Sequence, residues 1–150
     1  MKCFKNQFVK LLLPIVGLGL LLGAFGTAMA EDAGGHKLVI QVSTDDPVTQ
    51  KIALNNAVNL QKLYGMDNVT IEVVAYGPGL GLLTEKSKEK DRVKSLALQN
   101  ITFSACENTM KKVAKKTGKE PKLIEGVGVV NAGVARIMAL QEQGYAYLRP

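Results

Sequence analysis

Cysteine, histidine and tryptophan are scarce in this chain of 150 residues, which has two cysteines, one histidine and no tryptophan. Cys3 lies in the first thirty residues, so Cys106 is the only thiol in the remainder, and no CxxC pair exists. The lack of a CxxC pair argues against a self-sufficient dithiol oxidoreductase. With no Ser-His-Asp order and no histidine near Cys106 in the sequence, hydrolase catalysis is also unsupported.

The first thirty residues have the order of a secretory signal peptide. Three lysines precede an apolar run over residues 11–25, and Ala28-Met29-Ala30 then shows the small-x-small pattern of a cleavage site. The apolar run is interrupted by proline and glycine and is shorter than the roughly 20 residues that a membrane span needs. We therefore predict cleavage after Ala30, a periplasmic or secreted mature chain with no membrane attachment, a flexible lead over residues 31–36 and one domain over 37–150.

Charge is modest once this leader is set aside. The leader carries three lysines and no acids, which leaves 16 basic and 13 acidic residues, a net charge of +3 against +6 for the whole chain. Five of the lysines are spaced to lie on the outer face of one expected helix, at positions 111, 112, 115, 116 and 119. This is typical of a solvated helix face, although an acidic partner stays open. Nucleic-acid binding is not expected, because no aromatic residues interleave with the lysines.

Strand and helix patterns alternate along the rest of the chain. The expected strands cover residues 37–43, 69–75, 101–105, 123–130 and 145–148. The first is apolar along nearly its whole centre, as in a parallel strand buried on both faces. The pattern predicts an α/β fold, a three-layer α/β/α sandwich with a mainly parallel sheet of about five strands.

The sequence predicts the boundaries and inner face of the first helix, and the inner face of the last one. Asp46 and Pro47 fit the N-cap and first position of a helix that stops at Gly65. This capping role accounts for Asp46, so the Asp45-Asp46 pair does not predict a metal site. The residues expected to face inward are Ala53, Ala57, Leu60 and Tyr64 in this helix, and Val134, Ile137 and Met138 in the last one.

The hydrophobic period changes from about 2 to about 3.6 at Cys106. Apolar residues alternate up to Ala105 and then recur at helical spacing from Met110. Cys106 should therefore lie at a helix N-terminus, where the backbone N–H groups of Asn108 and Thr109 favour a thiolate. We predict a partly exposed thiol of low pKa that acts as a nucleophile. A small, inert core cysteine is the alternative.

A glycine-rich stretch, residues 76–81, follows the second expected strand. We predict a loop of tightly turned backbone here, with main-chain N–H groups at Gly77 and Gly79 facing a small anion. The stretch has no GxGxxG spacing and no Lys-Ser or Lys-Thr after it, so it is a poor nucleotide-binding motif. The alternative is a strand-end turn that closes over the neighbouring loop.

Several segments together resemble the DsrE/DsrF-like family of sulfur-relay proteins. They are the Ser-Thr-Asp-Asp-Pro end of the first strand, Glu-Val-Val-Ala-Tyr-Gly-Pro-Gly-Leu over residues 72–80, Phe-Ser-Ala-Cys-Glu-Asn-Thr-Met over 103–110 and Gln-Glu-Gln-Gly-Tyr-Ala-Tyr over 141–147. The resemblance covers residues 37–150. It implies a small α/β sandwich that forms homo-oligomers, often trimers or hexamers.

In members that carry sulfur, the carrier is a cysteine after the third strand, and Cys106 matches that position. The resemblance thus implies a persulfide on Cys106, with a sulfur donor or acceptor protein thiol as partner. No metal or organic cofactor is required for such a step. This chain departs from the well-studied relay members because it is predicted to be exported and has no second cysteine after the leader. A non-catalytic binding or assembly module of the same fold is the alternative function.

Overall fold

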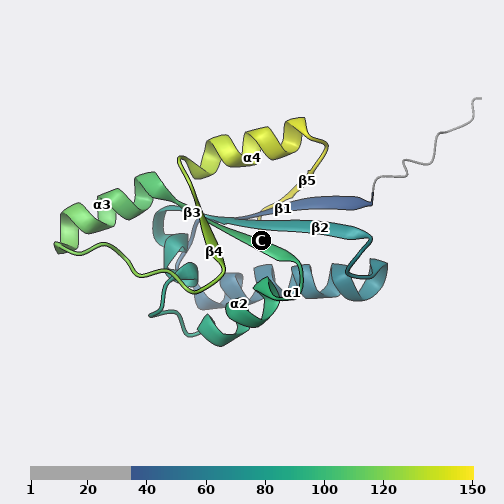
Figure 1. Cartoon of the computed structure of the whole chain (residues 1–150), viewed down its shortest axis with the longest axis horizontal. Coiled ribbons are helices and arrows are strands. Elements are labelled where there is room, and N and C mark those ends of the chain that lie inside the picture. The colour runs from purple at the N-terminus through teal and green to yellow at the C-terminus, as the bar shows by residue number, and fades with distance from the viewer. Residues whose placement is uncertain (1–34) are drawn as a thin grey trace, which may run out of the picture. The chain divides into compact units, whose positions relative to one another are not determined.

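A computed structural model describes residues 35–150, which form one five-stranded sheet in the order β4-β3-β2-β1-β5 (Figure 1). Every strand pair is parallel. The strands are β1 (His36–Val42), β2 (Val69–Ala75), β3 (Ile101–Cys106), β4 (Val127–Val130) and β5 (Ala146–Leu148). The predicted α/β class and parallel sheet are therefore confirmed. The expected leader, residues 1–30, and most of the expected lead lie outside the described residues, and His36 already belongs to β1.

Helices cover both faces of the sheet. Helices α1 (Pro47–Tyr64) and α2 (Lys90–Ala97) lie on one face, and α4 (Gly133–Glu142) lies on the other (Figure 1). Because successive strands β1, β2 and β3 step in one direction, right-handed connections place α1 and α2 on the same side. The connection from β4 to β5 runs back across the sheet, which places α4 on the opposite side.

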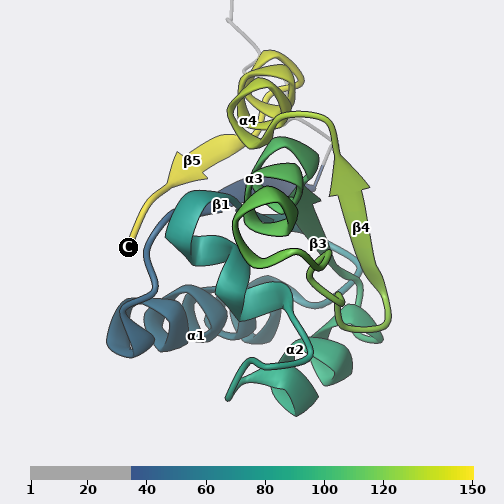
Figure 2. The same cartoon turned by 90° about the vertical axis from the view of Figure 1, so that its left-hand side faces the viewer.

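Two further elements lie at the carboxyl end of the strands. They are the 3₁₀ helix η1 (Gly77–Leu83) and helix α3 (Glu107–Thr117), which extends toward the viewer in Figure 2.

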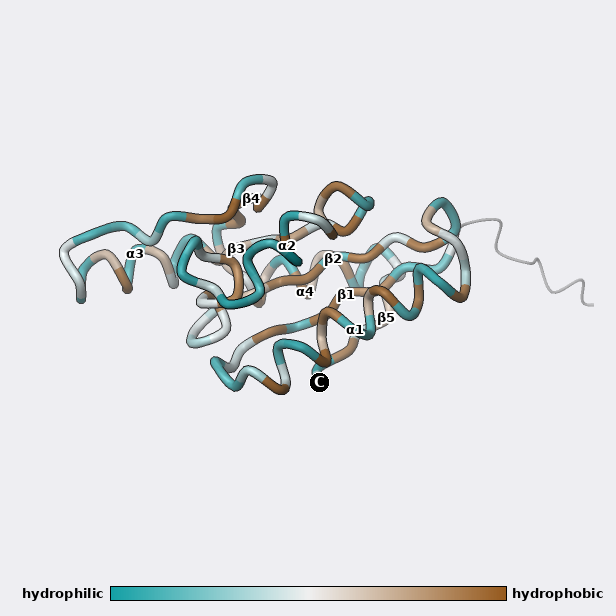
Figure 3. The backbone as a smooth tube through the Cα atoms, turned by 90° about the horizontal axis from the view of Figure 1, so that it is seen from below, coloured by the Kyte–Doolittle hydropathy of each residue, from teal (hydrophilic) through white to brown (hydrophobic). Residues whose placement is uncertain are grey.

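The hydrophobic core is larger on one face of the sheet than on the other. A large cluster that includes Ile40, Leu54 and Phe103 fills the space between the sheet and α1, α2 and η1. A small cluster of Val39, Val74, Ile137 and Leu140 lies under α4. Figure 3 shows the apolar residues concentrated along the central strands.

Local chemistry explains where α1 begins and ends. The Asp46 carboxylate accepts hydrogen bonds from the Thr49 backbone N–H at 2.7 Å and the Thr49 hydroxyl at 2.6 Å. Pro47 occupies the first position, and the helix stops at Gly65, whose φ of 87° suits glycine. The predicted helix boundaries are confirmed.

The predicted inner faces of two helices need correction. In α4, Val134 and Met138 are 67% and 62% exposed, while Ile137 and Leu140 are buried. Ile137 therefore faces inward as predicted and packs with Leu140 against Val39 and Val74, whereas the prediction for Val134 and Met138 is wrong. In α1, Ala53 and Ala57 are buried as expected, but Tyr64 is exposed.

The fourth strand is shorter than expected. Pairing covers only Val127–Val130, because the chain turns at Gly126, whose φ is 87°. Leu123 instead makes an isolated antiparallel bridge to Thr84. The residues before the turn therefore close over η1 rather than extend the sheet. Two smaller differences are that Tyr145 lies outside β5 and that the expected loop at residues 76–81 is largely the helix η1.

Candidate functional site

The candidate site lies where β2, β3 and β4 end, at the carboxyl edge of the parallel sheet. This edge is where open α/β sheets bind ligands. Cys106 is the last residue of β3 and pairs with Val130, the last residue of β4. Gly77 follows β2, and Gly133 follows β4. The three chain segments meet at the thiol.

Cys106 is the N-cap residue of α3. Its backbone is extended, with φ −76° and ψ 116°, and its side chain makes no capping hydrogen bond of its own to the helix. The thiol therefore lies at the positive end of the helix dipole, as the change of hydrophobic period predicted. The location of the thiol at a helix N-terminus is confirmed.

Opposing effects act on the pKa of Cys106. Burial raises the pKa, since it disfavours the charged thiolate. Nearby polar groups, namely the backbone N–H groups of Gly133, Thr109 and Asn108 and the Thr109 hydroxyl, lower the pKa, and together they outweigh burial. The pKa of the thiol is thus held below its ordinary value. The thiolate, which is the nucleophilic form, is favoured.

Cys106 is less accessible than its sequence position suggests. The residue is only 5% exposed, so the expectation of a partly exposed thiol is wrong. The segment between β4 and α4 lies beside the start of α3 and contributes to this burial. The Asn131 carbonyl holds this segment by accepting the Asn108 N–H at 3.3 Å. Direct access is therefore restricted to small, narrow reagents.

Thr109 connects the glycine-rich segment to the thiol. Its hydroxyl accepts the Gly77 N–H at 3.0 Å and helps to lower the pKa of Cys106. Gly77 has a φ of 55°, a conformation that favours glycine and turns its N–H toward α3. The Gly77 N–H is thus used by the protein itself. The residues proposed from the sequence to bind substrate are Gly77, Gly79, Asn108 and Thr109. Of these, Asn108 and Thr109 lie in the first turn after Cys106, and Gly77 contacts Thr109.

Gly79 has a different environment. A Cβ atom there would lie 2.2 Å from the Val42 carbonyl oxygen and 2.9 Å from the Ser43 nitrogen. The residue is buried, and its lack of a side chain lets η1 pack directly on the end of β1. Packing is enough to explain this glycine, and its predicted contact with a ligand stays a prediction.

A buried polar group near the site was not anticipated from the sequence. Glu72, in the middle of β2, is only 3% exposed. Arg136 of α4 binds its carboxylate through two nitrogens, at 2.8 and 2.6 Å, and the Ser104 hydroxyl donates to it at 2.6 Å. The one signal in the sequence is an acid within an otherwise apolar strand.

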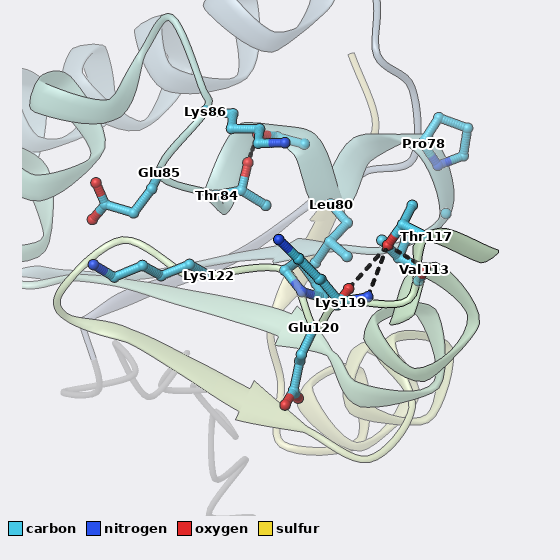
Figure 4. A pocket seen from close by; sticks show the side chains of 13 residues that line it. Pro78, Leu80, Thr84, Glu85, Lys86, Val113, Thr117, Lys119, Glu120 and Lys122 are labelled. Atoms are coloured by element: carbon cyan, nitrogen blue, oxygen red, sulfur yellow. Dashed lines mark hydrogen bonds between the residues drawn. The ribbon is translucent and has the colours of Figure 1, made fainter. Parts of the chain in front are cut away.

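A separate groove of about 690 Å³ lies between η1, the outer part of α3 and residues 117–122 (Figure 4). Leu80 and Val113 contribute apolar surface, and Lys86, Lys119 and Lys122 contribute charge. Cys106 does not line this groove. Within residues 35–150, no cluster of three potential metal ligands occurs, and no helix is long and apolar enough to cross a membrane.

Comparison with known proteins identifies the family and agrees with the fold. The model of the DsrE/DsrF-like family matches residues 36–150. The chain belongs to the DsrE/DsrF-like family. This DsrE/DsrF-like chain is similar to a solved structure of a protein of unknown function, MTH1491 from Methanobacterium thermoautotrophicum. The identity is 34% and the TM-score 0.69, over 77% of this chain and 99% of that chain.

A second solved structure, the ychN protein from E. coli, shares the fold. Its TM-score is 0.58 at 14% identity, again over 77% of this chain and 99% of that one. At this identity the similarity shows the architecture alone. No curated protein matches the chain.

Proposed function

We propose that this DsrE/DsrF-like chain carries sulfane sulfur as a persulfide on Cys106 and transfers it to a partner thiol. The observation that carries the proposal is the position of Cys106, which is the N-cap residue of α3 at the carboxyl edge of the sheet. There the neighbouring N–H groups and the Thr109 hydroxyl lower the pKa of the thiol, which favours a thiolate in a nearly closed site. Membership of the DsrE/DsrF-like family supports the same function.

The two steps need only thiolate chemistry. In the first, the Cys106 thiolate attacks the outer sulfur of a donor persulfide or polysulfide. A new S–S bond forms on Cys106, the old one breaks, and the donor leaves as a thiolate. In the second, a partner thiolate attacks the outer sulfur, and Cys106 leaves as a thiolate. A low pKa makes Cys106 a good leaving group, so the donors described above favour the transfer.

Sulfur uptake gives a direct test. We expect brief exposure of the folded protein to polysulfide to add the mass of one sulfur atom to the Cys106 peptide, and a thiol reductant to remove it. Cys106→Ser should show no addition at that peptide. Peptide mapping separates Cys106 from Cys3. A folded wild-type protein that gains no sulfur at Cys106 would contradict the proposal.

The second candidate function is a binding module in which Cys106 is inert. It is favoured by the 5% exposure of Cys106, which is typical of a packed core residue. Alkylation separates the two candidates. A carrier thiol reacts with iodoacetamide in the folded state, whereas an inert thiol reacts only after unfolding.

We also propose that the carrier acts outside the cytoplasm, on the strength of the basic, apolar and small-residue order of residues 1–30. Protein recovered from the exported fraction should begin at Glu31. N-terminal sequencing checks this, and an exported protein that begins at Met1 would contradict it.

We further propose a homo-oligomer. Val134 and Met138, one turn apart on α4, form an exposed apolar strip, and Tyr147 is exposed on the edge strand β5. Burying such surfaces between copies is favourable. Light scattering at micromolar concentration should give a multiple of the monomer mass, and the family resemblance favours a trimer or a hexamer. Met138→Glu should lower the measured mass. A wild-type monomer would be decisive against assembly.

A further inference from the structure

Glu72, Arg136 and Ser104 link the strand that carries the thiol to the helix that covers it. Ser104 precedes Cys106 by two residues on β3, so both side chains point to the same face of the sheet. Arg136 lies one turn after Gly133 on α4. The Glu72 carboxylate, on the neighbouring strand β2, binds both of them.

The geometry of this link is rigid. The Arg136 guanidinium contacts both carboxylate oxygens of Glu72, a two-point contact that fixes orientation as well as distance. The Arg136 backbone N–H also donates to the Ala132 carbonyl at 3.0 Å, which closes the first turn of α4. The position of the guanidinium therefore fixes the start of the helix, including Gly133.

Gly133 lies close against the site. The residue is buried, and a Cβ atom on it would approach the Tyr76 ring at 2.8 Å. Because Gly133 has no side chain, its backbone packs directly against Tyr76. The hydrogen bond from the Asn108 N–H to the Asn131 carbonyl, at 3.3 Å, places the segment that leads into Gly133 beside the start of α3, and the Gly133 N–H lowers the pKa of Cys106. A small rotation of α4 would remove this donor.

We propose that the Glu72–Arg136 pair, with Ser104, positions the start of α4 so that the Gly133 N–H points at Cys106 and sets the reactivity of the thiol. Glu72 and Arg136 are thus positioning residues that act through Gly133. The inference deepens the proposed function and rests on it, since it concerns the nucleophile of the carrier step.

The test compares the pH dependence of Cys106 alkylation in the wild type and in the double variant Glu72→Gln/Arg136→Met. The double variant removes one positive and one negative charge together, so their direct effects on the thiol largely cancel. We expect the thiol pKa to rise by about one unit, which is about a tenfold lower thiolate fraction at pH values well below the pKa. Gly133→Ala should also raise the pKa of the Cys106 thiol, because the added methyl group displaces α4 from Tyr76.

The matched control is Lys94→Met/Glu125→Gln. It removes an ion pair with a separation of 2.6 Å, between α2 and the segment before β4, and changes the same charges. We expect it to leave the alkylation profile unchanged. A purely structural role for Glu72 and Arg136 would lower the melting temperature without moving the thiol pKa, and that result in the double variant would overturn the inference.

The possible failures are distinguishable. If folded wild-type Cys106 does not react, the proposed function fails and the inference falls with it. If the wild-type thiol is reactive at low pH and the folded double variant has the same profile, only the inference fails. If the double variant does not fold, Ser104→Ala replaces it, since this change removes a single hydroxyl. A smaller rise in pKa then supports the inference, and an unchanged profile overturns it.

Discussion

Gly79→Ala is expected to lower the free energy of unfolding by about 3 kcal/mol, near the upper end of the usual cost of overpacking. The added Cβ would lie 2.2 Å from the Val42 carbonyl oxygen. That oxygen belongs to the backbone of β1, which pairs with strands on both sides, so it cannot move away cheaply. Urea denaturation monitored by circular dichroism measures the change.

Gly81→Ala is the matched control for this prediction. Gly81 lies two residues further along η1, and a Cβ there would have no atom within 4 Å. We expect a change within about 0.5 kcal/mol, as for ordinary surface positions. Equal losses in the two variants would show that the contact with β1 is not the reason for glycine at position 79.

Arg136→Met is expected to destabilise the protein by about 3 kcal/mol. It leaves the buried Glu72 carboxylate without its cation, and breaking one side of a buried ion pair typically costs about 3–5 kcal/mol. We expect the lower end of that range, because the Arg136 side chain is 37% exposed and water can partly replace it. Thermal and urea unfolding both report the loss.

Adding Glu72→Gln to this variant should restore most of the stability, to within about 1 kcal/mol of the wild type, because no unpaired charge then stays buried. The amide oxygen introduced by this substitution can still accept the Ser104 hydroxyl. If the double variant were as unstable as the single one, the loss would come from the packing of the Arg136 stem rather than from the buried charge.

The sequence predicts those parts of the fold that depend on local patterns. Alternating strand and helix periods give the parallel sheet, and the Asp46 cap and Gly65 stop bound α1 correctly. The change of period at Cys106 correctly predicts a helix start at the thiol. Each strand, helix boundary and cap depends on residues that are close together in the sequence.

Features that depend on distant segments could not be predicted in this way. Glu72 and Arg136 are 64 residues apart, and no local pattern fixes which turn of α4 lies over β2. The inner face of α4 was predicted correctly at Ile137 but wrongly at Val134 and Met138, because the sheet contact is made by Ile137 and Leu140 against Val39 and Val74. The segment after β4 likewise contributes to the burial of Cys106.

The hydrogen bond between Gly77 and Thr109 has a fixed direction. A hydroxyl has one hydrogen to donate and can accept through its lone pairs, whereas an amide N–H can only donate. Since the Gly77 N–H occupies an acceptor site on the Thr109 oxygen, the hydroxyl hydrogen stays available for a second partner, and the hydroxyl helps to lower the pKa of Cys106. The turn after β2 thus holds the hydroxyl through a backbone amide, whose polarity no pH change reverses.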